Sequence, residues 1–193
     1  YVYLKNYLPP SYLVKRVILD FHIDEKKTVL RSEFTIQTNK LTNKKEDLIL
    51  DGVNIKLKKL SINGHKINLK TIIFKKDKMI ISKNILKRQD FKIEMENHID
   101  PSSNKSLEGL YLSNDIICTQ CEPEGFRKIC YSIDRPDILS TYRVRLRGSY
   151  RCLLSNGNQV KKSRNFAEWD DPFPKPTYLF AIVAGNLNLH QDE

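Results

Sequence analysis

The stretch VKRVILDFHI (residues 14–23), DEKK (24–27) and TVLRSEFTIQT (28–38) decides the fold class. Its first segment is an apolar run broken by single charges. Its last segment alternates Leu30, Phe34 and Ile36 with polar or charged neighbours. A period of two is typical of a half-buried β-strand, and the charged tetrapeptide is typical of a turn. The stretch therefore predicts two strands joined by a short turn.

Further short apolar segments follow on both sides of turn residues. Asn63-Gly64 is the strongest hairpin signal, because both residues tolerate the left-handed conformation that a two-residue turn needs. The other predicted strands are residues 48–52, 54–62, 67–74, 79–81, 91–95, 107–111, 142–146, 152–154 and 178–183, and the Ile116-Ile117 run favours a further strand. We expect a short helical stretch at Ile138-Leu139 and an extended loop over residues 171–176, which contain three prolines. Strands at this spacing predict an all-β sandwich over one domain, residues 1–193.

The chain has 193 residues, of which 40% are hydrophobic and 29% charged. That length gives about one domain, large enough to fold around its own core without disulfides or metal. No apolar window is long enough to span a membrane, so a transmembrane helix is excluded. The start lacks the features of a signal peptide and an initiator Met, so we expect a segment of something longer.

The formal net charge is +10, from 33 Lys and Arg against 23 Asp and Glu. Lysine doublets at 26–27, 44–45, 58–59 and 75–76 are spread along the chain, as a solvated and compositionally biased surface would have them. Clustering on one face is the sign that would indicate nucleic acid. The sequence shows no such cluster, so we do not expect nucleic acid or a membrane as a partner.

Four cysteines, Cys118, Cys121, Cys130 and Cys152, are too few for a secreted disulfide scaffold. Cys118 and Cys121 form a C-x-x-C that could be half of a zinc site or a redox pair, but no second half follows. We expect reduced, structural thiols in a cytoplasmic protein. The histidines occur singly, and no H-E-x-x-H, Gly-rich phosphate loop or G-x-S-x-G is present. The residues predict no metal site and no catalytic residue in this segment.

An ordered series of motifs lies in the second half of the chain. It comprises EGLYLS (108–113), CTQCEPEGFR (118–127), DRPD (134–137), LLSNGN (153–158), DPFPKP (171–176) and YLFAIVAG (178–185). The series resembles the N-terminal domain of M1-family zinc aminopeptidases, of the bacterial aminopeptidase N type. The likeness extends to YLPPSY (7–12) and LDG (50–52), so it covers nearly the whole chain.

The resemblance implies a saddle-shaped antiparallel β-sandwich that packs on a catalytic domain following residue 193. That domain would hold the zinc and the general base, so neither is assigned to this segment. The resemblance assigns Glu122, with help from Gln120, to binding the free α-amine of a peptide substrate. On an extended segment these two side chains would share one face. Composition alone favours a simpler interpretation, in which Glu122 is an exposed loop acid near Arg127.

Two functions therefore remain open. The first is the substrate-anchoring domain of a cytoplasmic zinc aminopeptidase acting on peptides with a free N-terminus. The second is a free-standing basic β-sandwich that binds another protein or a polyanion without catalysis. In either case we expect Asp134 and Arg135 to brace a turn that Pro136 fixes. We expect four aromatic residues to pack in the core or at a domain interface: Trp169, Phe173, Tyr178 and Phe180.

Overall fold

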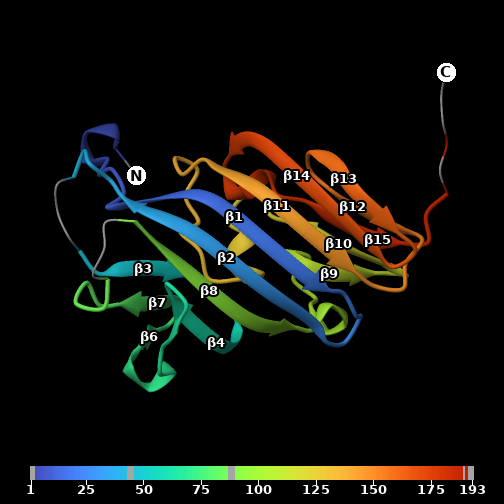
Figure 1. Cartoon of the computed structure of the whole chain (residues 1–193), viewed down its shortest axis with the longest axis horizontal. Helices are drawn as coiled ribbons and strands as arrows, with labels where there is room; N and C mark the ends of the chain where they lie inside the picture. Colours follow the sequence, from blue (N-terminus) through green and yellow to red (C-terminus); the bar gives the residue numbers. More distant parts are fainter. Residues whose placement is uncertain (1–2, 43–45, 87–89, 189, 191–193) are drawn as a thin grey trace.

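The computed structural model describes residues 3–42, 46–86, 90–188 and 190, so the lysine doublet at 44–45 lies outside them. Over this range the chain is built from β-strands with short 3-10 turns (Figure 1). The strands are β1 (Tyr12–His22), β2 (Thr28–Thr38), β3 (Leu48–Asp51), β4 (Lys56–Ile62), β5 (His65–Lys66), β6 (Ile73–Lys75), β7 (Lys78–Ile81), β8 (Asp90–Ile99), β9 (Gly109–Ser113), β10 (Ile116–Gln120), β11 (Ser140–Arg147), β12 (Cys152–Ser155), β13 (Asn158–Ser163), β14 (Phe166–Lys175) and β15 (Ile182–Gly185). The 3-10 turns are η1 (Leu4–Asn6), η2 (Leu69–Thr71), η3 (Pro101–Ser103), η4 (Phe126–Lys128) and η5 (Thr177–Leu179).

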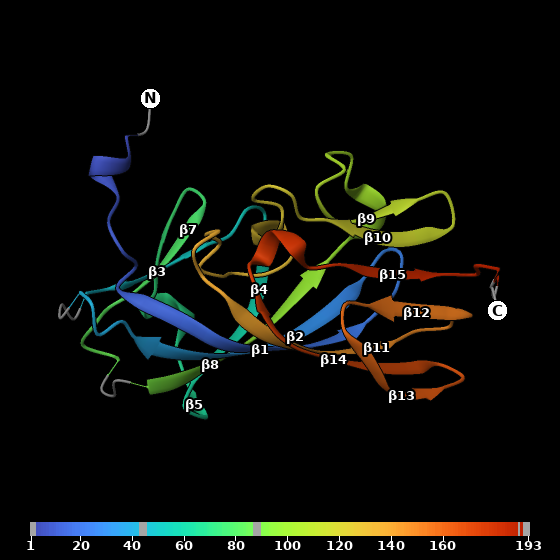
Figure 2. The ribbon, with the colours of Figure 1, turned by 90° about the horizontal axis from the view of Figure 1, so that it is seen from above.

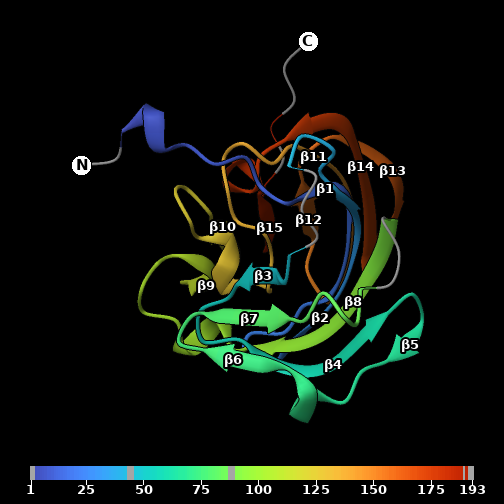
Figure 3. The ribbon, with the colours of Figure 1, turned by 90° about the vertical axis from the view of Figure 1, so that its left-hand side faces the viewer.

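Three sheets make up the sandwich. The largest has eight strands in the order β13-β14-β11-β1-β2-β8-β4-β5, and it curves strongly (Figure 3). A four-stranded sheet (β12-β15-β10-β9) and a three-stranded sheet (β3-β7-β6) lie over the same face of it (Figure 2). The pairings are antiparallel except that β1 runs parallel to β11. The predicted all-β sandwich is confirmed.

The segment that predicted the fold forms the centre of the large sheet. Strands β1 and β2 pair antiparallel, with Phe21 opposite Leu30, and both side chains are fully buried. The Asn63-Gly64 hairpin is also confirmed: it joins β4 to β5 with φ values of 51° and 76°. Both angles are in the left-handed region, which matches the type of turn that the dipeptide predicts.

Aromatic side chains fill the core between the layers. The Phe180 ring stacks on Phe21 and on Tyr142, which come from β1 and β11 of the large sheet. It also meets the Phe126 ring edge-on, with the centroids 5.3 Å apart. All four side chains are buried. Phe126 belongs to η4, so this cluster joins the large sheet to the turn that follows β10.

The predicted helical stretch at Ile138-Leu139 is wrong. The Ile138 N–H bonds to the Arg135 carbonyl and closes a single turn over Pro136 and Asp137, and β11 begins at Ser140. Because Ile138 is buried in the core, its side chain holds the turn against the sheet and leaves no room for a helix. The short helical turns lie elsewhere, at η1 to η5.

The boundaries predicted around the prolines are also wrong. Residues 171–175, expected to be a loop, continue β14. The partner strand β13 ends its pairing at Asp170, so Pro172 and Pro174 lie where a missing N–H costs no ladder bond on that side. Residues 178–181, expected to begin a strand, instead belong to η5 and the link to β15.

The strand predicted over residues 67–74 is likewise interrupted. The Asn68 side chain accepts a hydrogen bond from the Lys70 N–H at 3.0 Å, which starts the 3-10 turn η2. Strand β6 begins only at Ile73. An Asn side chain that bonds nearby backbone competes with strand pairing, and the apolar pattern alone did not reveal this competition.

Candidate functional site

The segment that carries Gln120 and Glu122 leaves the sheet between the two residues. Strand β10 ends at Gln120, and residues 122–125 form a turn closed by the Gly125 N–H on the Cys121 carbonyl at 2.9 Å. The expectation that both side chains share one face of an extended segment is therefore wrong. Instead, the Gln120 amide donates to the Glu122 carbonyl oxygen at 3.2 Å.

This turn depends on glycine at position 125. A Cβ there would lie 2.4 Å from the Gln120 carbonyl oxygen and 2.7 Å from the Cys121 Cα. Both neighbours are backbone atoms, which cannot move aside as the end of a side chain can. The turn after β10 is thus tightly folded back on the strand end, and it presents Glu122 and Glu124 to solvent.

Arg127 and Asp134 hold the turn in place from behind. The Asp134 carboxylate is 4% exposed and accepts three hydrogen bonds: from the Arg127 Nε at 2.9 Å, from the Arg127 N–H at 3.2 Å and from the Thr177 hydroxyl at 2.5 Å. The Arg127 guanidinium also donates to the Asp134 carbonyl at 3.0 Å. This network joins η4 to η5. It lies outside the turn at residues 134–137 that Asp134 was expected to brace, so that expectation stays a prediction.

A small pocket of about 270 Å³ lies between these elements. It is lined by Glu122, Pro123, Glu124, Asp134, Arg135, Pro136, Thr177 and Tyr178. Two of its three carboxylates share one cation, the Arg127 guanidinium, which lies 2.9 Å from Asp134 and 3.2 Å from Glu124. Within the described part of the chain, the Glu122 carboxylate makes no ion pair and no hydrogen bond. Glu122 is therefore the lining carboxylate that is available to a cationic group.

The charge at the mouth of the pocket is balanced by a second pair. Arg135 donates two hydrogen bonds to Asp137, at 2.8 and 2.6 Å, which lower the pKa of the Asp137 carboxyl. The Tyr7 hydroxyl donates to the same carboxylate at 2.9 Å. Because Asp137 already neutralises Arg135, the arginine does not compete with an incoming ligand for Glu122. The sequence predicted that Glu122 lies near Arg127, but it did not reveal that Arg127 binds Asp134 and Glu124 instead.

The aromatic residues expected to pack are divided between two environments. Phe180 belongs to the core, and the half-buried Trp169 donates its indole N–H to the Leu153 carbonyl at 3.0 Å. Phe173 is 72% exposed, and Leu179 beside the pocket is 48% exposed. The expected domain interface remains a prediction for these exposed side chains.

All four cysteines are free thiols. Cys121 and Cys130 are buried in the core, and burial raises the pKa of both thiols, which keeps them protonated and unreactive. Among the described residues, no group of three His, Cys, Asp or Glu side chains could hold a metal ion. No helix within the described ranges is long and apolar enough to cross a membrane.

Comparison with known proteins bears on the same region. Residues 8–179 match the family model described as the peptidase M1 N-terminal domain. Aminopeptidase N of Haemophilus influenzae is 38% identical over 99% of this chain, and that of Caulobacter vibrioides is 40% identical over 100% of it. The chain spans about a fifth of each relative's length, 22%.

Solved structures agree with the sequence matches. A crystal structure of Legionella pneumophila aminopeptidase A in complex with aspartic acid superposes with a TM-score of 0.87 and 34% identity, over 96% of this chain and 22% of that one. An M1 zinc metallopeptidase of Deinococcus radiodurans has a TM-score of 0.72 over 91% of this chain and 42% of that one. At 16% identity, this second likeness shows the fold alone.

Proposed function

This chain belongs to the M1 peptidase family as its N-terminal domain, and from this membership we propose that it anchors the substrate α-amine in a zinc aminopeptidase that removes N-terminal amino acids from peptides. One observation carries the proposal. Glu122 is the pocket carboxylate left without a partner among the described residues, while its two neighbours are both paired with Arg127. A carboxylate of this kind can accept a charge-assisted hydrogen bond from an α-ammonium group.

Gln120 has a positioning role in this proposal. Its side chain holds the Glu122 carbonyl at 3.2 Å, which fixes the turn that carries the carboxylate. An internal peptide nitrogen bears no charge, so a carboxylate at this place distinguishes a chain end from the middle of a peptide. Zinc would supply the activated water, and it would be held by residues outside this segment.

The remaining partners follow from the same proposal. A catalytic domain following this one would cover the exposed apolar side chains of Phe173 and Leu179 beside the pocket. The four free thiols support a cytoplasmic location, because that compartment keeps cysteines reduced. Peptides with a free N-terminus are the proposed substrates.

The test compares two glutamates of the same turn in the full-length protein that carries this domain. Loss of a charge-assisted hydrogen bond of about 1.5–3 kcal/mol should lower kcat/KM of Glu122→Gln about 10- to 150-fold for an aminoacyl anilide. Glu124→Gln removes the same charge from the same turn but leaves Glu122 in place, so it should change kcat/KM less than about threefold. Equal losses in the two variants, or none in Glu122→Gln, would show that Glu122 does not anchor the amine.

A further inference from the structure

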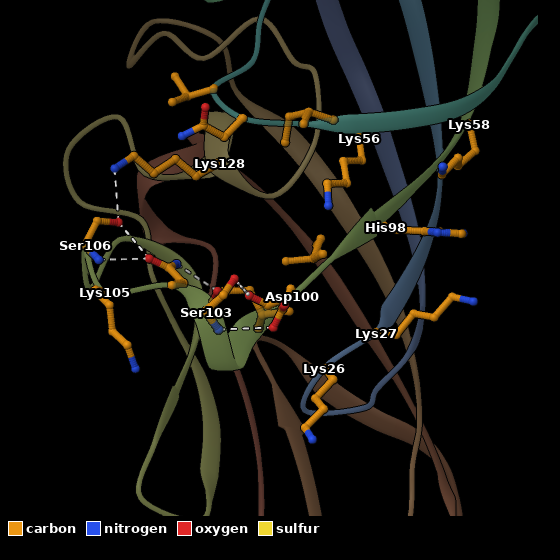
Figure 4. A pocket seen from close by; sticks show the side chains of 16 residues that line it. Lys26, Lys27, Lys56, Lys58, His98, Asp100, Ser103, Lys105, Ser106 and Lys128 are labelled. Atoms are coloured by element: carbon orange, nitrogen blue, oxygen red, sulfur yellow. Dashed lines mark hydrogen bonds between the residues drawn. The ribbon is translucent and has the colours of Figure 1, made fainter.

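A second, larger cavity of about 790 Å³ lies on another part of the domain (Figure 4). Four separate segments bring lysines to it: the turn between β1 and β2 (Lys26, Lys27), β4 (Lys56, Lys58), the loop before β9 (Lys105) and η4 (Lys128). We call this cavity the lysine groove. His98 of β8 also lines it. The structure therefore gathers in one place lysines that are spread along the sequence, a cluster that the sequence did not show.

The groove has a large excess of positive charge. Six ammonium groups face a single lining carboxylate, Asp100. Asp100 already accepts hydrogen bonds from the Ser102 hydroxyl at 2.7 Å and the Ser103 N–H at 3.1 Å, and these lower the pKa of its carboxyl. The Asp100 carboxylate thus binds donors of its own loop and not the lysines of the groove. Lys128 pairs with Glu108, and Lys105 donates to the Ser102 carbonyl at 3.2 Å.

The other four lysines have no such partners. Within the described part of the chain, the ammonium groups of Lys26, Lys27, Lys56 and Lys58 make no hydrogen bond and no ion pair. All four side chains are exposed. Four unneutralised cations around one cavity repel each other, and an anion in the cavity would relieve this repulsion.

A β-bulge directs one of these lysines into the groove. Leu57 of β4 lies opposite Asn97 of β8, and Lys59 lies opposite Glu96, so Lys58 is an extra residue without a partner across the ladder. Lys59 pairs with Glu96 at 2.9 Å, whereas Lys58 lines the cavity. Bulges commonly re-aim a side chain in this way. The backbone therefore separates a lysine that is neutralised from one that is not.

His98 reports the positive potential of the groove. Its pKa is lowered, first by desolvation and then by the charges of Lys58 and Lys27, with a smaller contribution from Lys59. Only Glu96 acts in the opposite direction. Desolvation and the nearby ammonium groups thus act in the same direction on this imidazole.

The lining also narrows the chemistry of the ligand. The described residues that line the groove include no arginine, so the groove has no guanidinium to form a bidentate pair with a planar carboxylate. They also include no Phe, Tyr or Trp on which a nucleic-acid base could stack. The serine hydroxyls of the loop before β9 donate within that loop, to Asp100 and Asn104. Ammonium groups are then the available donors, and lysine binds phosphate as a point charge.

We propose that the lysine groove binds a compact anion with several phosphate groups. Its volume is in the range of small-molecule sites, which favours a short polyphosphate or the phosphate chain of a nucleotide over an extended polymer. This site is separate from the Glu122 pocket, and its test does not depend on peptidase activity.

The test is calorimetric titration of the 193-residue chain, and of the full-length protein that carries it, with inorganic tripolyphosphate. Lys56→Gln/Lys58→Gln removes two of the four unpaired lysine charges at the groove and should weaken binding about tenfold. The matched control Lys66→Gln/Lys75→Gln removes two exposed charges that do not line the groove, and it should change the affinity less than about twofold. Equal loss in both variants would mean general charge attraction and would overturn the proposal.

A second readout locates the ligand. Bound tripolyphosphate should raise the pKa of His98 in a proton NMR titration, because it offsets the lysine charges, and His98→Gln identifies the signal. An unchanged His98 pKa at saturation would place the anion elsewhere and overturn the proposal. The proposal would also be overturned if a single-stranded oligonucleotide or an acidic peptide bound through Lys56 and Lys58 more tightly than tripolyphosphate does. It would be overturned as well if tripolyphosphate bound the 193-residue chain but not the full-length protein. ATP as a second probe distinguishes a nucleotide from free polyphosphate.

Discussion

Removing the Asp134 carboxylate is the sharpest test of how the Glu122 turn is held. In Asp134→Ala, the Arg127 guanidinium loses its 2.9 Å partner and the buried Thr177 hydroxyl loses its acceptor. Removal of one partner of a buried pair costs about 3–5 kcal/mol. The Arg127 side chain is 19% exposed and keeps Glu124 at 3.2 Å, so we expect the lower end, about 3 kcal/mol of unfolding free energy.

Urea unfolding of the chain, followed by circular dichroism, measures this loss. With a slope of about 2 kcal/mol per molar, the midpoint should fall by about 1.5 M. Asp170→Asn is the control, because Asp170 pairs only loosely with Arg16 at 4.0 Å and both side chains are well exposed. Its midpoint should move by less than about 0.3 M.

A double-mutant cycle with Arg127→Met isolates the pair itself. If the guanidinium left unpaired causes the loss, then Asp134→Ala should cost at least about 1 kcal/mol less in the Arg127→Met background. An equal cost in both backgrounds would refute the reasoning, because the carboxylate would then act through Thr177 or the backbone. A total loss below about 1 kcal/mol would show that the network does not hold the turn.

Three further predictions test other parts of the structure. Burial raises the pKa of Glu168, but hydrogen bonds from two β11 arginines outweigh it, so the net pKa is lowered. Stability from this group is present above its unfolded pKa and lost as pH falls through its folded pKa, so Glu168→Gln should reduce the loss of unfolding free energy between pH 7 and pH 3 by up to about 1 kcal/mol, as urea unfolding at the two pH values would show. Iodoacetamide should label the half-buried Cys118 in the native chain but the fully buried Cys130 only in denaturant, as mass spectrometry would show; native labelling of Cys130 would contradict its burial. Gly52→Ala should lower the unfolding free energy by about 1–3 kcal/mol in the same urea assay, because a Cβ would lie 2.3 Å from the Tyr131 ring, and a neutral result would mean that the ring can move aside.

The sequence predicts most of the strands, but it misses β13 and β14 and places strand ends poorly. Alternation along β2 and the Asn63-Gly64 turn are local patterns, so both are recovered. The strand status of residues 171–175 is not local, because it depends on where β13 ends beside β14. The same applies to Ile138, whose burial against the sheet prevents the expected helical stretch.

The candidate site shows the same division. Motif order points to Glu122 and Gln120, and both lie at the turn after β10. Arg127 binds Glu124 three residues before it and Asp134 seven residues after it, and Asp134 also accepts a hydrogen bond from Thr177 of η5, about fifty residues further along the chain. The sequence places several acids near Arg127, but only the folded turn shows that Glu122 is the one left unpaired among the described residues.

Net charge and charge placement therefore carry different information in this domain. The excess of +10 is compatible with a biased but inert surface, and sequence alone favours that interpretation. The pattern of ion pairs changes this interpretation. Lys58 and Lys59 are neighbours at the bulge in β4, but Lys59 pairs with Glu96 whereas Lys58 lines the groove. Likewise Arg127 pairs with Glu124, and Glu122, two residues away, makes no ion pair among the described residues. In both places a backbone irregularity decides which of two similar side chains remains able to bind a ligand. Because compositional bias acts on residue types and not on bulges or turns, these unpaired charges are the ones that a binding function would explain.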